Sequence, residues 1–205
     1  MSQATLNKSA LSRLERQRDL YKRFLPSLEM KRRTLLAERQ QTAAQLAAQR
    51  AEIDALEAEV GEALPMLADD DVVLEAPLRI ATLRLGDENR VGVRLPVLAE
   101  LAIERAAYPR LVQPHWMDGV LERLEQRLRL EVAQRIATRR LAILDAAART
   151  VTQRVNLFEK VMIPQAESAI ARIELYLADQ ERASVVRAKL AKRKRQAAER
   201  REEGA

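Results

Sequence analysis

Three consecutive aspartates, Asp69, Asp70 and Asp71, form the densest group of potential metal ligands in the sequence. Carboxylates bind Ca²⁺ and Mg²⁺, so a cation site is one hypothesis for this stretch. The surrounding residues lack the glycine turn and the later carboxylate of a calcium-binding loop. We therefore interpret the three aspartates as part of a solvated loop.

Residue types that could carry out catalysis are few. The single histidine, His115, has no neighbouring cluster of carboxylates, and the chain has no cysteine. The five glycines stand at 61, 86, 92, 119 and 204, so the sequence has neither a Walker-type phosphate loop nor a Gly-x-Gly-x-x-Gly turn. We interpret His115 and the adjacent Trp116 as structural. The sequence predicts a protein that is not an enzyme and that uses no cofactor or metal.

A basic run near the C-terminus is the strongest charged feature. Its cations are Arg187, Lys189, Lys192, Arg193, Lys194 and Arg195. Such a run could bind nucleic acid or an anionic membrane, but it lacks interleaved aromatic residues for base stacking and a large apolar face. Residues 1–40 and 182–205 each carry a net charge of +6, and the middle carries −6. If the two basic ends lie side by side, an acidic socket formed by other subunits would relieve their repulsion.

The composition favours long helices over a compact core. Aromatic residues make up only 3% of the chain and charged residues 32%, with few glycines and prolines. No uncharged apolar segment is long enough to span a membrane, and the first residues do not resemble a signal peptide. The absence of cysteine is compatible with a reducing, cytoplasmic setting.

The N-terminal region, residues 1–60, is predicted to be one long helix from about Leu6 to Val60. Apolar residues at heptad spacing form a seam for another helix; it includes Leu11, Leu14, Leu28 and Leu35. Asn7 or Ser9 could cap the helix start. Because the heptad pattern continues through Pro26, we expect a bend there rather than a break.

The central region, residues 61–117, is predicted to contain a β-hairpin at about 78–95 and a short helix at 97–113. Alternating apolar residues flank Gly86-Asp87-Glu88-Asn89, which is expected to form the hairpin loop. Pro96 is expected to stop the second strand. A lone hairpin is marginally stable, so it must pack on helices or on a partner.

The C-terminal region, residues 118–205, is predicted to be one helix, possibly interrupted, that extends to about Arg200 with Asp118 as a candidate N-cap. Its seam runs through Leu144, Ala148, Val151, Val155, Phe158 and Met162, and then shifts to Ala166, Ile170, Ile173 and Leu177. The extra four-residue step is a stutter, which locally unwinds a supercoil. Pro164 lies at that shift.

Two helices of this length favour a mainly α fold. At 1.5 Å per residue they would measure roughly 80 and 120 Å, too long for a compact domain of this mass. The expected solution is a long antiparallel two-helix coiled coil formed by the N- and C-terminal helices, with the small hairpin-containing region at one end.

Several stretches resemble the D subunit of V/A-type rotary ATPases. The most specific is Arg154-Val155-Asn156-Leu157-Phe158-Glu159, followed by Val161-Met162-Ile163-Pro164. The stretch Asn7-Lys8-Ser9-Ala10-Leu11, with Lys31-Arg32-Arg33 later, is similar to that family's N-terminal helix, and Val91-Gly92-Val93-Arg94-Leu95-Pro96 to its hairpin strand. Pro26 and the region 97–125 depart from the family pattern.

The resemblance implies a non-catalytic central rotor shaft that couples ATP hydrolysis or synthesis to proton or sodium transport. Its implied partners are the catalytic A and B subunits, the F subunit and the subunit that links the shaft to the membrane ring. The implied location is cytoplasmic, peripheral to the membrane, with neither nucleic acid nor a direct membrane span. We expect Lys8, Arg13, Arg187 and Lys192 to lie near the bearing in the hexamer. The alternative is a coiled-coil scaffold or nucleic-acid-associated protein.

Overall fold

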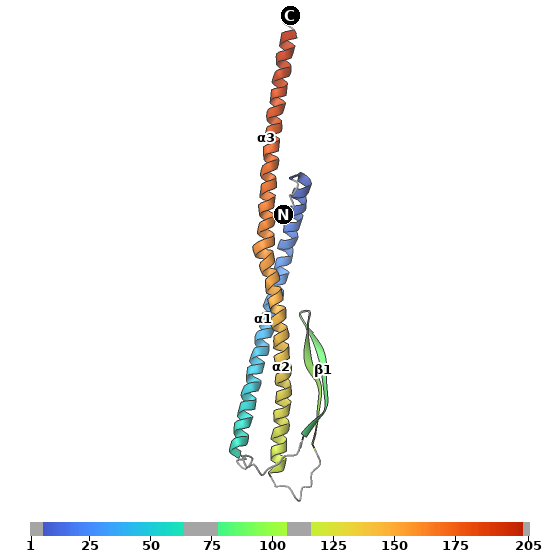
Figure 1. Cartoon of the computed structure of the whole chain (residues 1–205), viewed down its shortest axis with the longest axis vertical. Coiled ribbons are helices and arrows are strands. Elements are labelled where there is room, and N and C mark those ends of the chain that lie inside the picture. Colours follow the sequence, from blue (N-terminus) through green and yellow to red (C-terminus); the bar gives the residue numbers. More distant parts are fainter. Residues whose placement is uncertain (1–5, 64–77, 106–115, 203–205) are drawn as a thin grey trace. The chain divides into compact units, whose positions relative to one another are not determined.

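The computed structural model describes residues 6–63, 78–105 and 116–202. In chain order its elements are helix α1 (Lys8–Ala63), strands β1 (Leu78–Arg90) and β2 (Val93–Arg105), helix α2 (Met117–Leu157), the π-helical turn η2 (Phe158–Met162) and helix α3 (Ile163–Glu202) (Figure 1). The predicted mainly α fold, with long terminal helices and a central antiparallel hairpin, is confirmed. The three aspartates at 69–71 and His115 lie outside the described residues.

Helix α1 begins as the sequence indicates. The backbone N–H of Ala10 donates a 2.7 Å hydrogen bond to Oδ1 of Asn7, which makes Asn7 the N-cap. The helix continues through Pro26 without a break, although proline has no N–H to donate to the carbonyl four residues earlier. At the other predicted cap, α2 begins one residue early, so Asp118 lies in its first turn rather than at the N-cap.

The chain divides into two units, and the first combines residues 1–30 with 152–205. Within it α1 and α3 are antiparallel, because Lys22 pairs with Glu167 while the earlier Lys8 pairs with the later Glu181. The buried apolar side chains of this unit are Ala10 on α1 and, along one stripe of the opposite helix, Val155, Ile163, Ala166, Ile170 and Ile173. Half-buried Leu11, Leu14, Leu25 and Leu28 continue the α1 side of the contact. This is the narrow seam of a two-stranded coiled coil.

The second unit, residues 31–151, contains the rest of α1, the hairpin and most of α2. Its buried apolar residues again form stripes: Leu35, Leu46 and Leu56 on α1, Val120, Leu121, Val132, Ala137, Leu144 and Ala148 on α2, and Leu95 on the hairpin. Glu57 pairs with Arg127, and Arg39 with Asp145, so α1 and α2 are also antiparallel.

The hairpin turn lies further along the chain than predicted. Gly86-Asp87-Glu88-Asn89 belongs to β1, and the turn is the dipeptide Val91-Gly92. Both residues have positive φ, 54° and 75°, as a two-residue turn of type I′ requires. Oδ1 of Asn89 accepts a 2.9 Å hydrogen bond from the N–H of Gly92, which helps to hold Val91 in a conformation that valine rarely adopts. Because Gly86-Asp87-Glu88-Asn89 has residue types that are common in loops, the sequence pattern predicted the loop too early in the chain.

The helix predicted over 97–113 is wrong for its first part, because β2 continues to Arg105. Leu101 pairs with Leu83, and Ile103 with Ile80, on β1. Pro96 does not stop the strand; it lies opposite Asp87, and in a two-stranded sheet its missing N–H can face outward. Cross-strand pairing therefore overrides the helical tendency of this alanine- and glutamate-containing stretch. Residues 106–113 lie outside the described part of the chain.

The predicted seam shift occurs, but the backbone achieves it with a π turn rather than a stutter. The N–H of Ile163 donates to the carbonyl of Phe158, five residues earlier. Ile163 is buried, whereas Met162 is only half-buried. One extra residue in this turn brings Ile163 to the seam, after which α3 continues with the usual three- and four-residue steps.

Candidate functional site

The residues predicted to form the helix-pairing seam are buried to different degrees. Leu35, Val151 and Val155 are buried, whereas Leu11, Leu14, Leu28, Phe158 and Met162 are half-buried. Tyr21 and Phe158 meet edge to face, with ring centroids 5.1 Å apart. All five half-buried seam residues belong to the first unit, so its seam is only partly shielded from water.

The four motif residues Arg154, Asn156, Ile163 and Pro164 bracket the π turn. Only Ile163 is buried; Asn156 is half-buried, and Arg154 and Pro164 are exposed. Pro164 has no N–H, so it cannot bond to the carbonyl of Lys160 as a regular α-helix requires. The irregular hydrogen bonding of η2 immediately precedes this proline. Ile163 and Pro164 thus lie where the seam shifts, and Arg154 and Asn156 lie just before the π turn.

The four predicted bearing cations, Lys8, Arg13, Arg187 and Lys192, are all exposed but form no single cluster. Lys8 lies 3.9 Å from Glu181, so Arg187 and Lys192 lie further along α3 than the start of α1. Residues 8–22 of the N-terminal basic segment therefore lie beside α3 before residue 182, and not beside the basic tail. The two +6 segments are consequently offset, because α3 extends past its partner helix.

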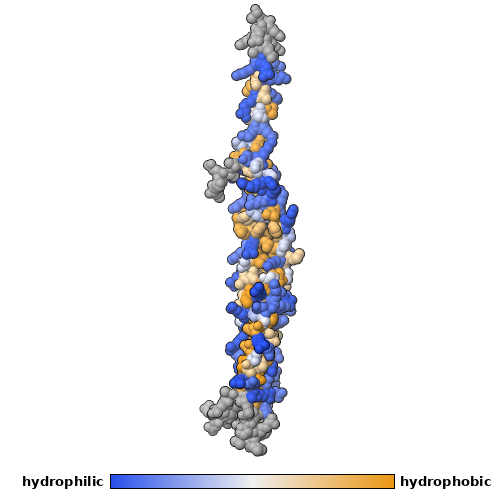
Figure 2. Space-filling view, turned by 90° about the vertical axis from the view of Figure 1, so that its right-hand side faces the viewer, coloured by the Kyte–Doolittle hydropathy of each residue, from blue (hydrophilic) through white to orange (hydrophobic). Residues whose placement is uncertain are grey.

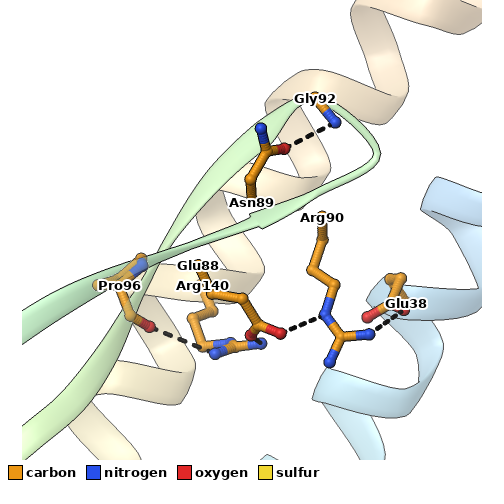
Figure 3. A network of polar contacts seen from close by, with 7 residues as sticks. All are labelled: Glu38, Glu88, Asn89, Arg90, Gly92, Pro96 and Arg140. Atoms are coloured by element: carbon orange, nitrogen blue, oxygen red, sulfur yellow. Dashed lines mark hydrogen bonds and ion pairs between the residues drawn. The ribbon is translucent and has the colours of Figure 1, made fainter.

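A chain of charged groups fastens the hairpin tip to both helices of the second unit (Figure 3). Arg90 bonds to Glu88 at 2.5 Å within β1 and approaches Glu38 of α1 at 3.7 Å. Arg140 of α2 donates to Glu88 and to the carbonyl of Pro96, each at 3.4 Å. We call Glu38, Glu88, Arg90 and Arg140 the tip network. It gives the hairpin the support on helices that its small size requires.

A second contact holds the hairpin base to α2. The carboxylate of Glu125 accepts hydrogen bonds from Arg129, at 2.6 Å, and from Arg105 of β2, at 2.8 and 3.0 Å. These bonds lower the pKa of Glu125, with Arg129 the larger cause and Arg105 the second. The same contact with Glu125 raises the pKa of Arg105. Glu125 is therefore held as a carboxylate between two cations.

A groove of about 310 Å³ lies between the hairpin and α2. Its walls are mainly apolar: Ile80, Leu83, Leu85 and Pro96 from the hairpin, and Leu128, Val132 and Ile136 from α2. Together with buried Leu95, these side chains show how the hairpin packs on the helix. Neither the tip network nor this groove was predicted from the sequence, because the turn and the end of β2 were misplaced.

The described residues present both apolar and charged side chains at the surface of the helices and the hairpin. Within them, no group of three His, Asp or Glu side chains is placed to hold a metal ion. No helix in the same ranges is long and apolar enough to cross a membrane. In Figure 2 hydrophobic residues gather in patches among many hydrophilic ones. The fold and these surfaces define a class of protein: a two-helix coiled coil with an attached hairpin, suited to contacts with other polypeptides.

Comparison with known proteins agrees with this class. The sequence matches the family of ATP synthase D subunits over residues 10–193. It is 30% identical to a V-type ATP synthase D subunit of Borreliella burgdorferi over 192 residues, which cover 94% of this chain and 95% of the relative. The corresponding protein of Chlamydia pneumoniae is 30% identical over 194 residues, covering 92% of this chain and 88% of the relative. The chain belongs to the ATP synthase D-subunit family.

Proposed function

We propose that this chain is the central rotor shaft of a V/A-type ATPase. In this role it couples ATP hydrolysis or synthesis in a catalytic hexamer to the movement of protons or sodium ions by rotation. The main support is the family match over residues 10–193, which includes both long helical regions and the hairpin. The shaft itself contributes no catalytic residue.

The helical structure suits the transmission of torque. Buried apolar stripes join α1 to α3 in the first unit and α1 to α2 in the second. Twisting one helix relative to the other would expose these seams, and the free energy lost on exposing apolar surface opposes the motion. A paired shaft is therefore stiffer than a single helix.

The proposed partners follow from family membership. They are the catalytic A and B subunits, the F subunit and the subunit that links the shaft to the membrane ring, and the complex would place this chain on the cytoplasmic side, peripheral to the membrane. The exposed cations Lys8, Arg13, Arg187 and Lys192 are proposed to meet the inner surface of the hexamer. Exposed charges suit contacts that must form and break as the shaft turns, because such contacts have little fixed geometry.

A charge-reversal experiment tests this function. The chain would be co-produced with the other subunits of its ATPase, and Lys8, Arg13, Arg187 and Lys192 would all be changed to Glu. We expect less assembled complex and a lower ratio of ions pumped to ATP hydrolysed. The matched control reverses four exposed arginines elsewhere, Arg50, Arg94, Arg139 and Arg149. Equal loss in both variants, or in neither, would contradict the proposed bearing.

The rotor role itself is tested by omitting the chain. A complete ATPase complex produced without this chain should lose coupling between ATP hydrolysis and ion transport, and adding the wild-type chain should restore it. Salt-sensitive binding to DNA or RNA, with no effect on the ATPase, would instead support the nucleic-acid-associated alternative.

A further inference from the structure

Four large apolar side chains are exposed close to the π turn in the first unit. Leu20 and Phe24 lie one helical turn apart on α1, and Leu157 and Val161 lie one turn apart at the junction of α2 and η2. Between 38% and 52% of each residue's surface is exposed. We call these four residues the apolar patch. Single exposed leucines are ordinary, but a contiguous group marks a binding surface.

The heptad pattern places all four residues on one side of the helix pair. In α1, Leu11, Leu14, Tyr21, Leu25 and Leu28 are seam positions a and d, which makes Leu20 a c position and Phe24 a g position. In the opposite helix, Val151, Val155 and Phe158 are the seam positions before the π turn, so Leu157 is c. Val161 lies one turn further along, within the π turn, on the same side of the helix as Leu157. Positions c and g are adjacent on a helix and flank the same side of the seam.

Two ion pairs show which sides of the antiparallel helices face the same way. Lys8 pairs with Glu181, and Lys22 pairs with Glu167 at 2.7 Å. All four residues are at e positions of their heptads, counting α3 from Ile163 and Ala166 as a and d. Since e positions meet e positions on one side, g positions must meet g positions on the other. The apolar patch therefore lies on the side opposite to these ion pairs.

The rim of the apolar patch is positively charged. Arg13, at a c position, and Arg154, at a g position, lie on the same side of the helix pair, one beyond each end of the patch on its own helix. Both are exposed, and neither makes an ion pair within the described residues. An apolar centre with cations at its margins is complementary to an apolar surface bordered by carboxylates.

We propose that the apolar patch is the docking site for an amphipathic helix of another protein, whose apolar stripe is flanked by Asp or Glu. A helix is favoured because the patch residues are spaced one turn apart along both helices, which suits ridges-into-grooves packing of a third helix. A second copy of this chain is disfavoured, because it would bring the same uncompensated arginines to the interface. Arg13 is also one of the proposed bearing cations, whereas the four residues of the apolar patch are not, and the proposal does not require the rotor function.

The test uses the full chain and a fluorescent helical peptide of roughly 20 residues, long enough to form a helix. The peptide has leucine in its apolar stripe and glutamate on both flanks, and a matched peptide has lysine there. We expect fluorescence anisotropy to show binding of the glutamate peptide and at least tenfold weaker binding of the lysine peptide. The double variant Phe24→Gln, Leu157→Gln should bind the glutamate peptide about tenfold or more weakly than the wild type. Arg154→Glu should also lower the affinity for this peptide.

The control variant combines Met30→Gln with Leu190→Gln, two exposed apolar residues outside the patch. It should bind the glutamate peptide like the wild type, and circular dichroism would verify that every variant is folded. Equal binding of both peptides, unchanged binding by the Phe24/Leu157 variant, or no binding by the wild type would overturn the proposal. Concentration-dependent dimers that disappear in the Phe24/Leu157 variant would show self-association instead. None of these results alters the assembly test of the proposed rotor function.

Discussion

Leu35 and Leu36 are neighbours in α1, yet their environments differ completely. Leu35 has no exposed surface, whereas Leu36 is 44% exposed. Successive residues in a helix point about 100° apart, so only one of two adjacent leucines can face a narrow seam. In a fold with so few aromatic residues, single leucines at such positions carry a large share of the buried apolar surface.

This difference predicts unequal effects of the same substitution. Leu35→Ala should lower the free energy of unfolding by about 2–5 kcal/mol, because it removes buried methyl groups and leaves a cavity. Leu36→Ala should change it by less than about 0.5 kcal/mol, since its side chain is partly in water. Urea denaturation followed by circular dichroism measures both. Similar losses for the two variants would show that the seam does not distinguish these positions.

The carboxylate of Glu125 predicts a specific response to acid. Its pKa is lowered below the ordinary 4.5 by Arg129 and Arg105, so its stabilising contribution is present above pH 4.5. That contribution is lost as the pH falls through the lowered pKa of the folded protein. The wild type should therefore lose more stability between neutral and acidic pH than Glu125→Gln, measured by thermal unfolding at each pH. Parallel pH profiles for the two proteins would contradict this role.

At the scale of elements, the π turn and the hairpin are the two places where the backbone departs from regular helix pairing. In η2 one extra residue is accommodated between Phe158 and Ile163, which keeps Val155 and Ile170 in the seam on either side. At the hairpin, a sheet too small to be stable alone is fastened to helices by the tip network and by Glu125. Both elements depend on contacts with a neighbouring helix.

The π turn predicts that one deletion is tolerated and another is not. Deleting Lys160, which is exposed in η2, should convert the turn to regular α-helix and leave both halves of the seam in place. Deleting exposed Gln153 from α2 should instead rotate Val155 and all later seam residues by about 100°. The first variant should unfold within a few degrees of the wild type, and the second at a clearly lower temperature. Equal melting temperatures would argue against a one-residue insertion in the seam.

The tip network predicts how tightly the hairpin is held. Arg140→Met should remove its contacts with Glu88 and Pro96, and hydrogen exchange in β1 and β2 near the turn should become roughly tenfold faster, as expected for about 1.4 kcal/mol of lost interaction. The control is Arg139→Met, at the adjacent exposed arginine. It should leave exchange in these strands nearly unchanged. If both variants exchange alike, the network does not hold the tip.

At the scale of the molecule, helix continuity is the property that a rotor shaft needs. Helix α1 runs without a break from Lys8 to Ala63, and α2, η2 and α3 follow one another from Met117 to Glu202 without a loop. Each of these helical runs therefore belongs to both units of the chain. In the proposed rotor role, torque would have to be transmitted along these helical runs.

Interrupting this continuity should separate assembly from coupling. Insertion of three glycines between Met30 and Lys31 should locally break α1, because glycine disfavours helix and exposes backbone groups. We expect the complex to assemble and to hydrolyse ATP, with fewer ions transported per ATP. The same three glycines appended after Ala205 serve as the control. Full coupling in the inserted variant would mean that α1 does not carry torque at this point.

Much of this architecture follows from local sequence. The long helices were predicted, with Asn7 or Ser9 as the cap, because helical periodicity and capping depend on residues only a few positions apart. Of the eight predicted seam residues, Leu35, Val151 and Val155 are buried. The shift of the seam near Pro164 was also visible as a change in apolar spacing.

Other features were decided only by tertiary structure. The true hairpin turn at Val91-Gly92 and the extension of β2 to Arg105 depend on cross-strand pairing, which outweighs weak local preferences. The π turn depends on keeping Ile163 against the opposite helix, since local spacing alone allowed a stutter. The tip network joins residues 38, 88, 90 and 140, whose approach is set by the packing of α1, the hairpin and α2. Local sequence determined where this chain is helical, and long-range packing determined how the irregular segments fit against those helices.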